Sequence, residues 1–233
     1  MNSLSQFLVT TRWPAKYPDR LQLYSRATPN GVKVSIMLEE TGLPYEVHTV
    51  DFDTGDQKTV EFLSLNPNNK IPAIIDPCGP DGAPIALFES AAILIYLADK
   101  TGHFMPSDAR RYEAIQWLMF LAGGITPMFG QLGFFHKFAG REYEDKRPLQ
   151  RYVAESKRLL SVLERHLVSR RWVMGEEYSV VDMSIFPWVR NLVGFYDAAE
   201  LVEFERYPRV KEVLDHFIAR PAVRRGLNIP PRP

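Results

Sequence analysis

Cysteine is almost absent from this chain: Cys78 is the only one among 233 residues. A single cysteine excludes an intrachain disulfide and a metal site built from cysteines. The five histidines lack the spacing of metal ligands, such as His-x3-His. We therefore expect no metal, and a reducing compartment fits the cysteine count.

An excess of charge of either sign is also missing. Lys and Arg total 28 and so do Asp and Glu, which gives a formal net charge of zero. Nucleic-acid binding depends on a surplus of Lys and Arg, so no nucleic-acid partner is expected. The first twenty residues contain no apolar leader, and the apolar runs are shorter than a bilayer span. These absences predict a cytoplasmic protein without a membrane partner.

Apolar residues are plentiful, at 45% of the chain against 24% charged residues, which is typical of a globular protein with a full core. The first half alternates between strand and helix patterns, and Gly42 stands where a helix C-cap belongs. The crossover helix predicts a parallel strand pair, and the later strands predict a hairpin. The expected strands are 21–24, 45–50, 71–76 and 84–88, with helices near 34–41 and 89–100, and a polar, turn-like segment at 51–69.

Strand signals vanish in the second half, where apolar residues keep helical spacing. Pro127 is expected to break or kink a helix that begins near Tyr112. Ser179 and Asp182 form a capping pattern, and Pro208 suits a first helical position. The fold class is therefore an α/β domain followed by an all-α domain. The expected boundaries are an arm at 1–20, an α/β domain at 21–101, a linker at 102–107 and a helical domain at 108–233.

Ile71-Pro72 opens the third expected strand. A proline there cannot donate to the ladder, and a cis bond is one use for it. Ile71 would then offer its backbone N–H and C=O to a peptide-like ligand, as an edge strand does. The alternative is a trans edge proline without a ligand.

Glu89-Ser90 lies where a strand ends and a helix begins. The free N–H groups and positive dipole of a helix N-terminus suit a carboxylate, and Glu89 suits an ammonium. Together they would hold an amino-acid head group. The alternative is that Ser90 only caps its own helix.

Thr28-Pro29-Asn30-Gly31 connects the first strand to the first helix. The Thr28 hydroxyl and the Asn30 amide can donate hydrogen bonds to a thiolate, which the helix dipole also favours. Neither group is a good general base, so such a site would lower the pKa of a bound thiol. The alternative is an ordinary turn.

The order of these three motifs on a β-α-β-β-β-α pattern resembles that of the cytosolic glutathione transferases. The resemblance extends from about residue 21 to residue 221. Thr28-Pro29 takes the place of the first Cys-Pro of thioredoxins and glutaredoxins, and Asn69-Lys70-Ile71-Pro72 is similar to the family's cis-proline strand. Within the family, the chain is most similar to the bacterial nu class and the related Ure2-like disulfide-bond reductases, which have a thioredoxin-like first domain.

The resemblance implies a role for each site residue. Thr28 and Asn30 would face the sulfur of glutathione, which serves as co-substrate. Glu89 and Ser90 would hold the γ-glutamyl group, and the backbone of Ile71, before Pro72, would pair with the cysteinyl part. Further glutathione contacts would come from Gln57, at the glycine end, from Lys70 and from Arg151.

Other residues could act at the same site. Tyr24 is near the position of a catalytic tyrosine in some classes, but its place within a strand favours a core or wall residue. Ser25 is an alternative thiol donor to Thr28. Phe134, Phe135 and His136 are candidates for an apolar second-substrate pocket. Cys78 lies in a hairpin turn and receives no catalytic role.

The predicted function is that of a glutathione-dependent disulfide-bond reductase or glutathione transferase. It stabilises the thiolate of glutathione, which attacks a disulfide or an electrophile. By resemblance, its partners are glutathione or oxidised glutathione and a second copy of the chain, in a homodimer. Two alternatives remain. One is a transferase or peroxidase that acts on apolar electrophiles or hydroperoxides, and the other is a non-enzymatic glutathione-binding module.

Overall fold

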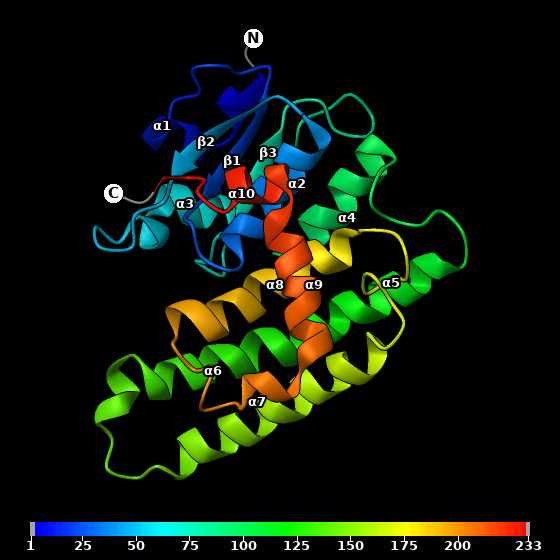
Figure 1. The fold of residues 1–233 in the computed structure, drawn as a ribbon. Coiled ribbons are helices and arrows are strands. Elements are labelled where there is room, and N and C mark those ends of the chain that lie inside the picture. Colours follow the sequence, from blue (N-terminus) through cyan, green and yellow to red (C-terminus); the bar gives the residue numbers. More distant parts are fainter. Residues whose placement is uncertain (1–2, 232–233) are drawn as a thin grey trace. The chain divides into compact units, whose positions relative to one another are not determined.

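The computed structural model describes residues 3–231 and divides the chain into two units. The first comprises Met1–His103 with Pro221–Pro233, and the second is Phe104–Arg220. The C-terminal helix α10 (Pro221–Gly226) therefore groups with the first unit, whereas the sequence pattern assigned it to the helical domain. It packs against α2 (Gly31–Thr41), as Figure 1 shows, and the hydroxyl of Ser35 donates to the carbonyl of Gly226 at 2.7 Å.

A four-stranded mixed sheet forms the centre of the first unit. Its strands are β1 (Leu21–Ser25), β2 (Tyr45–Thr49), β3 (Ala73–Asp76) and β4 (Ile85–Phe88), in the order β2-β1-β3-β4. β1 and β2 are parallel, and the other two pairs are antiparallel. The expected parallel pair, hairpin and thioredoxin-like fold class are confirmed.

Helices cover both faces of this sheet, and one of them, α3 (Val60–Leu65), was not predicted from the sequence. It is only six residues long and lies in the segment that reads as polar; the Thr59 hydroxyl caps it by accepting the N–H of Phe62 at 3.3 Å. Phe62 is buried in a cluster with Leu4 and Val9, so the N-terminal arm packs on the first unit. Besides α2, this unit contains α1 (Val9–Arg12), α4 (Ser90–Thr101) and short 3-10 helices at Ser3–Gln6 and Asp56–Lys58.

In the second unit, a helical run extends from Arg110 to His136. It consists of α5 (Arg110–Phe120), a π-helical turn (Leu121–Ile125) and α6 (Thr126–His136). Of the expected break or kink at Pro127, the break is wrong, because this proline lies in the first turn of α6, directly after the π-helical turn. By length and mean hydropathy the run meets the criterion for a membrane span, although shorter apolar runs were expected. Core helices of soluble proteins meet the same criterion, so this is weak evidence for a membrane span.

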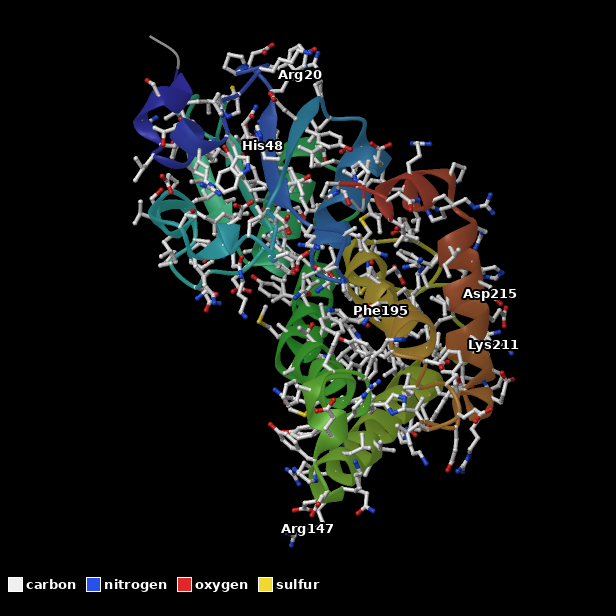
Figure 2. All side chains as sticks on the ribbon, turned by 90° about the vertical axis from the view of Figure 1, so that its left-hand side faces the viewer. Arg20, His48, Arg147, Phe195, Lys211 and Asp215 are labelled. Carbon is white, nitrogen blue, oxygen red and sulfur yellow. The ribbon has the colours of Figure 1, made fainter. Side chains whose placement is uncertain are left out.

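The remaining helices of this unit include two whose starts follow from the sequence. Asp182 completes a capping box with Ser179 at the start of α8, and Pro208 is the first residue of α9. Figure 2 labels Lys211 and Asp215, one turn apart on the exposed side of α9, while Val210 and other apolar residues of α9 are buried. The elements are α7 (Arg147–His166), α8 (Val180–Arg190), α9 (Pro208–Ala219), a π-helical turn (Asn191–Phe195) and 3-10 helices at Ala139–Glu142 and Phe204–Arg206.

Candidate functional site

Strand register gathers three separate chain segments at one end of the sheet. Ala73, the first residue of β3, pairs with Phe88 at the end of β4 and with Tyr24 near the end of β1. The chain leaves β1 toward α2 and leaves β4 toward α4. Both helix N-termini therefore lie beside the loop that precedes β3. Each helix directs the positive end of its dipole to this place.

A pocket of about 250 Å³ opens where the three segments meet. It is mostly polar, which suits a charged, peptide-like ligand better than an apolar one. Six residues predicted from the motifs line it, together with two asparagines that were not predicted. The lining residues are Asn30, Asn66, Asn68, Lys70, Ile71, Pro72, Glu89 and Ser90.

The turn before α2 presents hydrogen-bond donors. The Thr28 hydroxyl oxygen accepts the N–H of Gly31 at 3.2 Å, which leaves its O–H proton as a donor. Asn30 holds the N-cap position without a side-chain cap; its Oδ1 instead accepts from Nζ of Lys33 at 2.8 Å. Gly31 is required here, because a Cβ would lie 2.0 Å from the carbonyl oxygen of Arg26.

The turn before α4 does not match the simple capping alternative. Glu89, not Ser90, holds the N-cap position of α4, and it makes no side-chain cap. Its φ of 70° lies in the left-handed region, which is unusual for a glutamate. The Glu89 side chain is exposed, while Ser90 is only 9% exposed and its hydroxyl oxygen accepts from Nζ of Lys33 at 3.3 Å.

The loop before β3 is shaped by Asn66, which is 1% exposed. Its amide nitrogen donates to the carbonyl of Lys70 at 2.6 Å, and its oxygen accepts the N–H of Asn68 at 2.9 Å. The Ile71-Pro72 peptide bond is cis. Within residues 3–231, no hydrogen bond involves the backbone N–H or C=O of Ile71, so both groups are available to a ligand.

Lys33 is the main site residue that the motifs did not reveal. It is 1% exposed, on α2 directly behind the pocket. Burial lowers the pKa of Lys33 to about 7, while the nearby carboxylate of Glu89 acts in the opposite direction. The available signal was its position four residues before Met37, which places a lysine on the inward face of the helix.

Two predicted glutathione contacts in the first unit, Thr28 and Gln57, are not among the pocket-lining residues. Gln57 lies in the 3-10 helix Asp56–Lys58, and its Oε1 is buried without a hydrogen-bond partner in the described part of the chain. Ser25, the alternative thiol donor, is completely buried, and its hydroxyl donates to the carbonyl of Arg26 at 3.4 Å.

Four further predicted residues belong to the second unit. Arg151 is exposed on α7. On α6, Phe134 is 37% exposed and meets Phe135 edge to face. Phe135 stacks on Tyr152, and a ring nitrogen of His136 lies 3.3 Å from the carbonyl oxygen of Asp197. Phe134, Phe135 and Tyr152 form an aromatic cluster within their own unit. The roles of Arg151, Phe134, Phe135 and His136 in binding stay predictions. In the described ranges of both units, no three His, Cys, Asp or Glu side chains form a group able to hold a metal ion.

The chain matches two family models. The model of the glutathione S-transferase N-terminal domain matches residues 27–100, and that of the C-terminal domain matches residues 148–216. A curated relative from Escherichia coli K12, the disulfide-bond oxidoreductase YghU, is 43% identical over 220 residues. That match covers 91% of this chain and 74% of the relative.

Solved structures include relatives with higher identity. A glutathione transferase from Burkholderia graminis, with two glutathione molecules bound per subunit, is 69% identical, with a TM-score of 0.98. The match covers 100% of this chain and 98% of that one. A glutathione transferase from Pseudomonas putida, with one glutathione disulfide bound per subunit, is 64% identical, with a TM-score of 0.96. That match covers 97% of this chain and 99% of the relative.

Proposed function

The chain belongs to the glutathione S-transferase family, and from this premise we propose that it is a glutathione-dependent disulfide-bond reductase. The observation that carries the proposal is the pocket that joins Asn30, the open backbone of Ile71 and the Glu89-Ser90 pair. Glutathione has a thiol, a peptide backbone and an amino-acid head group, and each of these meets a suitable group in that pocket. The relative YghU bears the name disulfide-bond oxidoreductase, which supports the choice of reaction.

The γ-glutamyl end of glutathione is assigned to the start of α4. Its carboxylate accepts from the Ser90 hydroxyl and from free N–H groups of the helix N-terminus. Its ammonium pairs with the carboxylate of Glu89. The cysteinyl backbone pairs with the N–H and C=O of Ile71, as a peptide adds to a strand edge. Lys70 and Gln57, whose Oε1 is buried without a hydrogen-bond partner among the described residues, serve the glycine end, and Arg151 is a further contact carried from the family resemblance.

The thiol is assigned to the turn before α2. The O–H of Thr28 and the amide of Asn30 donate hydrogen bonds to the sulfur, and the α2 dipole favours its negative charge. Neither side chain removes the proton, which leaves to solvent. The site acts by lowering the pKa of the bound thiol, and it thereby raises the fraction of nucleophilic thiolate at neutral pH.

Reduction then proceeds in two exchanges. The thiolate attacks one sulfur of the substrate disulfide, forms a glutathione mixed disulfide and releases the other sulfur as a thiolate. A second glutathione thiolate attacks the glutathione sulfur of the mixed disulfide and releases the second substrate thiolate. The two glutathiones leave as oxidised glutathione, so two electrons pass to the substrate. The two glutathiones per subunit in the Burkholderia graminis relative and the glutathione disulfide in the Pseudomonas putida relative fit this sequence.

A second candidate function is conjugation of apolar electrophiles, or reduction of hydroperoxides, by the same thiolate. The observation that favours it is the aromatic cluster on α6, where Phe134 is 37% exposed and Phe135 stacks on Tyr152. These side chains, with His136, would form the wall of an apolar second-substrate pocket. We further propose a cytoplasmic homodimer, which the family resemblance supports; sedimentation at micromolar concentration distinguishes a dimer from a monomer.

The test compares two glutathione-dependent reactions of the purified protein. One is the reduction of a small dialkyl disulfide, coupled to glutathione reductase, and the other is conjugation of an aryl halide. Each is measured with wild type, Thr28→Ala, Asn30→Ala and the double variant. We expect the disulfide reaction to dominate and to fall about 100-fold or more in the double variant, because both thiolate donors are removed.

Ser25→Ala is the matched control, since it removes a hydroxyl three residues from Thr28 that is completely buried and does not line the pocket. It should keep the wild-type rate. Dominant conjugation by wild type would favour the second candidate. Glutathione binding without turnover in either assay would indicate a non-enzymatic binding module, and absence of glutathione binding would refute both enzymatic functions.

A further inference from the structure

One buried ammonium connects the two helix starts that line the pocket. Nζ of Lys33 donates to Oδ1 of Asn30 at 2.8 Å and to Oγ of Ser90 at 3.3 Å. Asn30 belongs to the turn before α2, and Ser90 is the first residue of α4, sixty positions later in the chain. Lys33 does not itself line the pocket.

The chemistry of these contacts sets the direction of each hydrogen bond. A lysine ammonium only donates, so both partner oxygens act as acceptors. The carbonyl end of the Asn30 amide is therefore the end turned toward Lys33, and the NH2 end is turned away from it. The Ser90 oxygen accepts from Lys33, so its own O–H is directed to another acceptor. Both contacts therefore direct a donor away from Lys33, the NH2 of Asn30 and the O–H of Ser90. Hydrogen-bond donors are what an anionic ligand needs.

A role in packing alone does not explain this lysine. Lysine is almost never fully buried, because removing its ammonium from water is costly. A methionine has a similar length and would fill the same space without that cost. Lys33 is instead buried where its ammonium reaches two pocket side chains, those of Asn30 and Ser90.

We propose that Lys33 is a positioning residue that orients the Asn30 amide toward the glutathione sulfur and the Ser90 hydroxyl toward the γ-glutamyl carboxylate. This inference rests on the proposed glutathione site. It predicts that the two ends of the site are energetically coupled through Lys33, although Asn30 and Ser90 come from different helices. It also places a positive charge behind the thiolate donor, which favours the ionised sulfur.

Other charged groups around α2 have partners of their own. The carboxylate of Glu89, at the β4–α4 turn, favours the charged form of Lys33 and so acts to raise its pKa. Arg225 of α10 pairs with Glu39 of α2, and Lys100 of α4 pairs with Asp76 of β3. Arg26, before the α2 turn, pairs with Asp51 and Asp53. The remaining charged residues on these elements are Glu40 of α2, Asp99 of α4 and Arg224 of α10, and Lys70 lies across the pocket.

The first test is Lys33→Met, with Ser35→Ala as the matched control. Ser35 is equally buried on α2, and its hydroxyl bonds the carbonyl of Gly226, away from the pocket. The pKa of the bound glutathione thiol is followed by thiolate absorbance near 240 nm, alongside kcat and KM. In Lys33→Met we expect this pKa to rise by about one unit and kcat/KM to fall about 10- to 100-fold. Ser35→Ala should leave both values unchanged.

A second test leaves Lys33 in place, in case the methionine variant does not fold. Asn30→Ala, Ser90→Ala and the double variant form a double-mutant cycle on kcat/KM. If Lys33 holds both side chains, loss of one partner alters the orientation of the other, and the double variant differs from the product of the single effects by about threefold or more. Additive effects would overturn the proposal, as would a wild-type thiol pKa in folded Lys33→Met.

The failures of the two proposals are distinguishable. A wild-type protein that neither binds nor turns over glutathione would refute the glutathione site itself. A wild-type protein that is active, combined with an additive cycle and an unaffected Lys33→Met variant, would refute only the role of Lys33.

Discussion

The ring of Tyr24 stacks on the imidazole of His48, with centroids 4.7 Å apart and planes 21° from parallel. His48 lies on β2, beside β1, as Figure 2 shows. Tyr24 is completely buried, and burial raises its pKa well above the usual range. The expectation that Tyr24 is a core residue is therefore confirmed. Tyr24 is therefore not exposed to act as a thiol donor, the role that a tyrosine has in some transferase classes.

This burial predicts the effect of Tyr24→Phe. The hydroxyl of Tyr24 has no hydrogen-bond partner among the described residues, so its removal deletes an unsatisfied polar group. We expect glutathione-dependent turnover within twofold of wild type and a free energy of unfolding equal to wild type or higher by about 1 kcal/mol. Urea denaturation and the coupled disulfide assay check the two values. A loss of turnover comparable to that of Thr28→Ala would contradict the assignment of the thiol to the α2 turn.

Glu89→Gln and Ser90→Ala should separate substrate binding from chemistry. Both residues are assigned to the γ-glutamyl head group, which does not change during the reaction. Their loss should raise KM for glutathione about tenfold and leave kcat within about threefold. Steady-state kinetics with glutathione as the varied substrate gives both constants. Asp81→Asn, in the exposed hairpin turn, is the charge-matched control. A large fall in kcat at constant KM would instead place Glu89 or Ser90 at the sulfur.

The sequence predicted the elements whose apolar spacing is long enough to show a period. The strands of the sheet, α2 with its Gly42 cap and the capping box of α8 were all correctly assigned. The helix α3 was missed because six residues give less than two full turns of pattern. The continuation past Pro127 was missed because a π-helical turn has no sequence signal of its own.

The candidate site divides in the same way. Asn30, Ile71 and Ser90 could be named because each follows a local rule for a turn, a strand edge or a helix start, and strand register then brought them together. Lys33 was not predicted, because one of its two hydrogen-bond partners is distant in the sequence. The partner of Lys33 at Ser90 is 57 residues away, and only the tertiary structure shows that contact.

The capping box at the start of α8 should be a major contributor to stability of the second unit. The carboxylate of Asp182 accepts the N–H groups of Val173 and Ser179, each at 2.9 Å, and the Ser179 hydroxyl at 3.0 Å. Asp182→Ala leaves two buried N–H donors without partners, so we expect a loss of about 2–4 kcal/mol in the free energy of unfolding.

Asp145→Ala is the matched control for that change. Asp145 also accepts the N–H of a residue at a helix start, Arg147, but in an exposed position. Its removal should cost about 1 kcal/mol or less. Equal losses in the two variants, measured by urea denaturation, would contradict the special role of the buried carboxylate.

Lys33 should make the stability of the unliganded protein depend on pH in a defined direction. The pKa of Lys33 is lowered to about 7 by burial, whereas an unfolded lysine titrates near 10.4. Between these values the unfolded state binds more protons than the folded state, so stability rises with pH, by at most about 1.4 kcal/mol per pH unit. Well below pH 7 both states are protonated and the cost of burying the charge is fully present. Lys33→Met lacks this group, and all other titrating groups cancel in the comparison. The free energy of unfolding of wild type minus that of Lys33→Met should therefore be nearly flat below pH 6, begin to rise toward pH 7 and climb most steeply from pH 7 to 9. Urea denaturation at half-unit intervals measures this difference, and parallel curves for the two proteins would show that Lys33 keeps an ordinary pKa in the folded state.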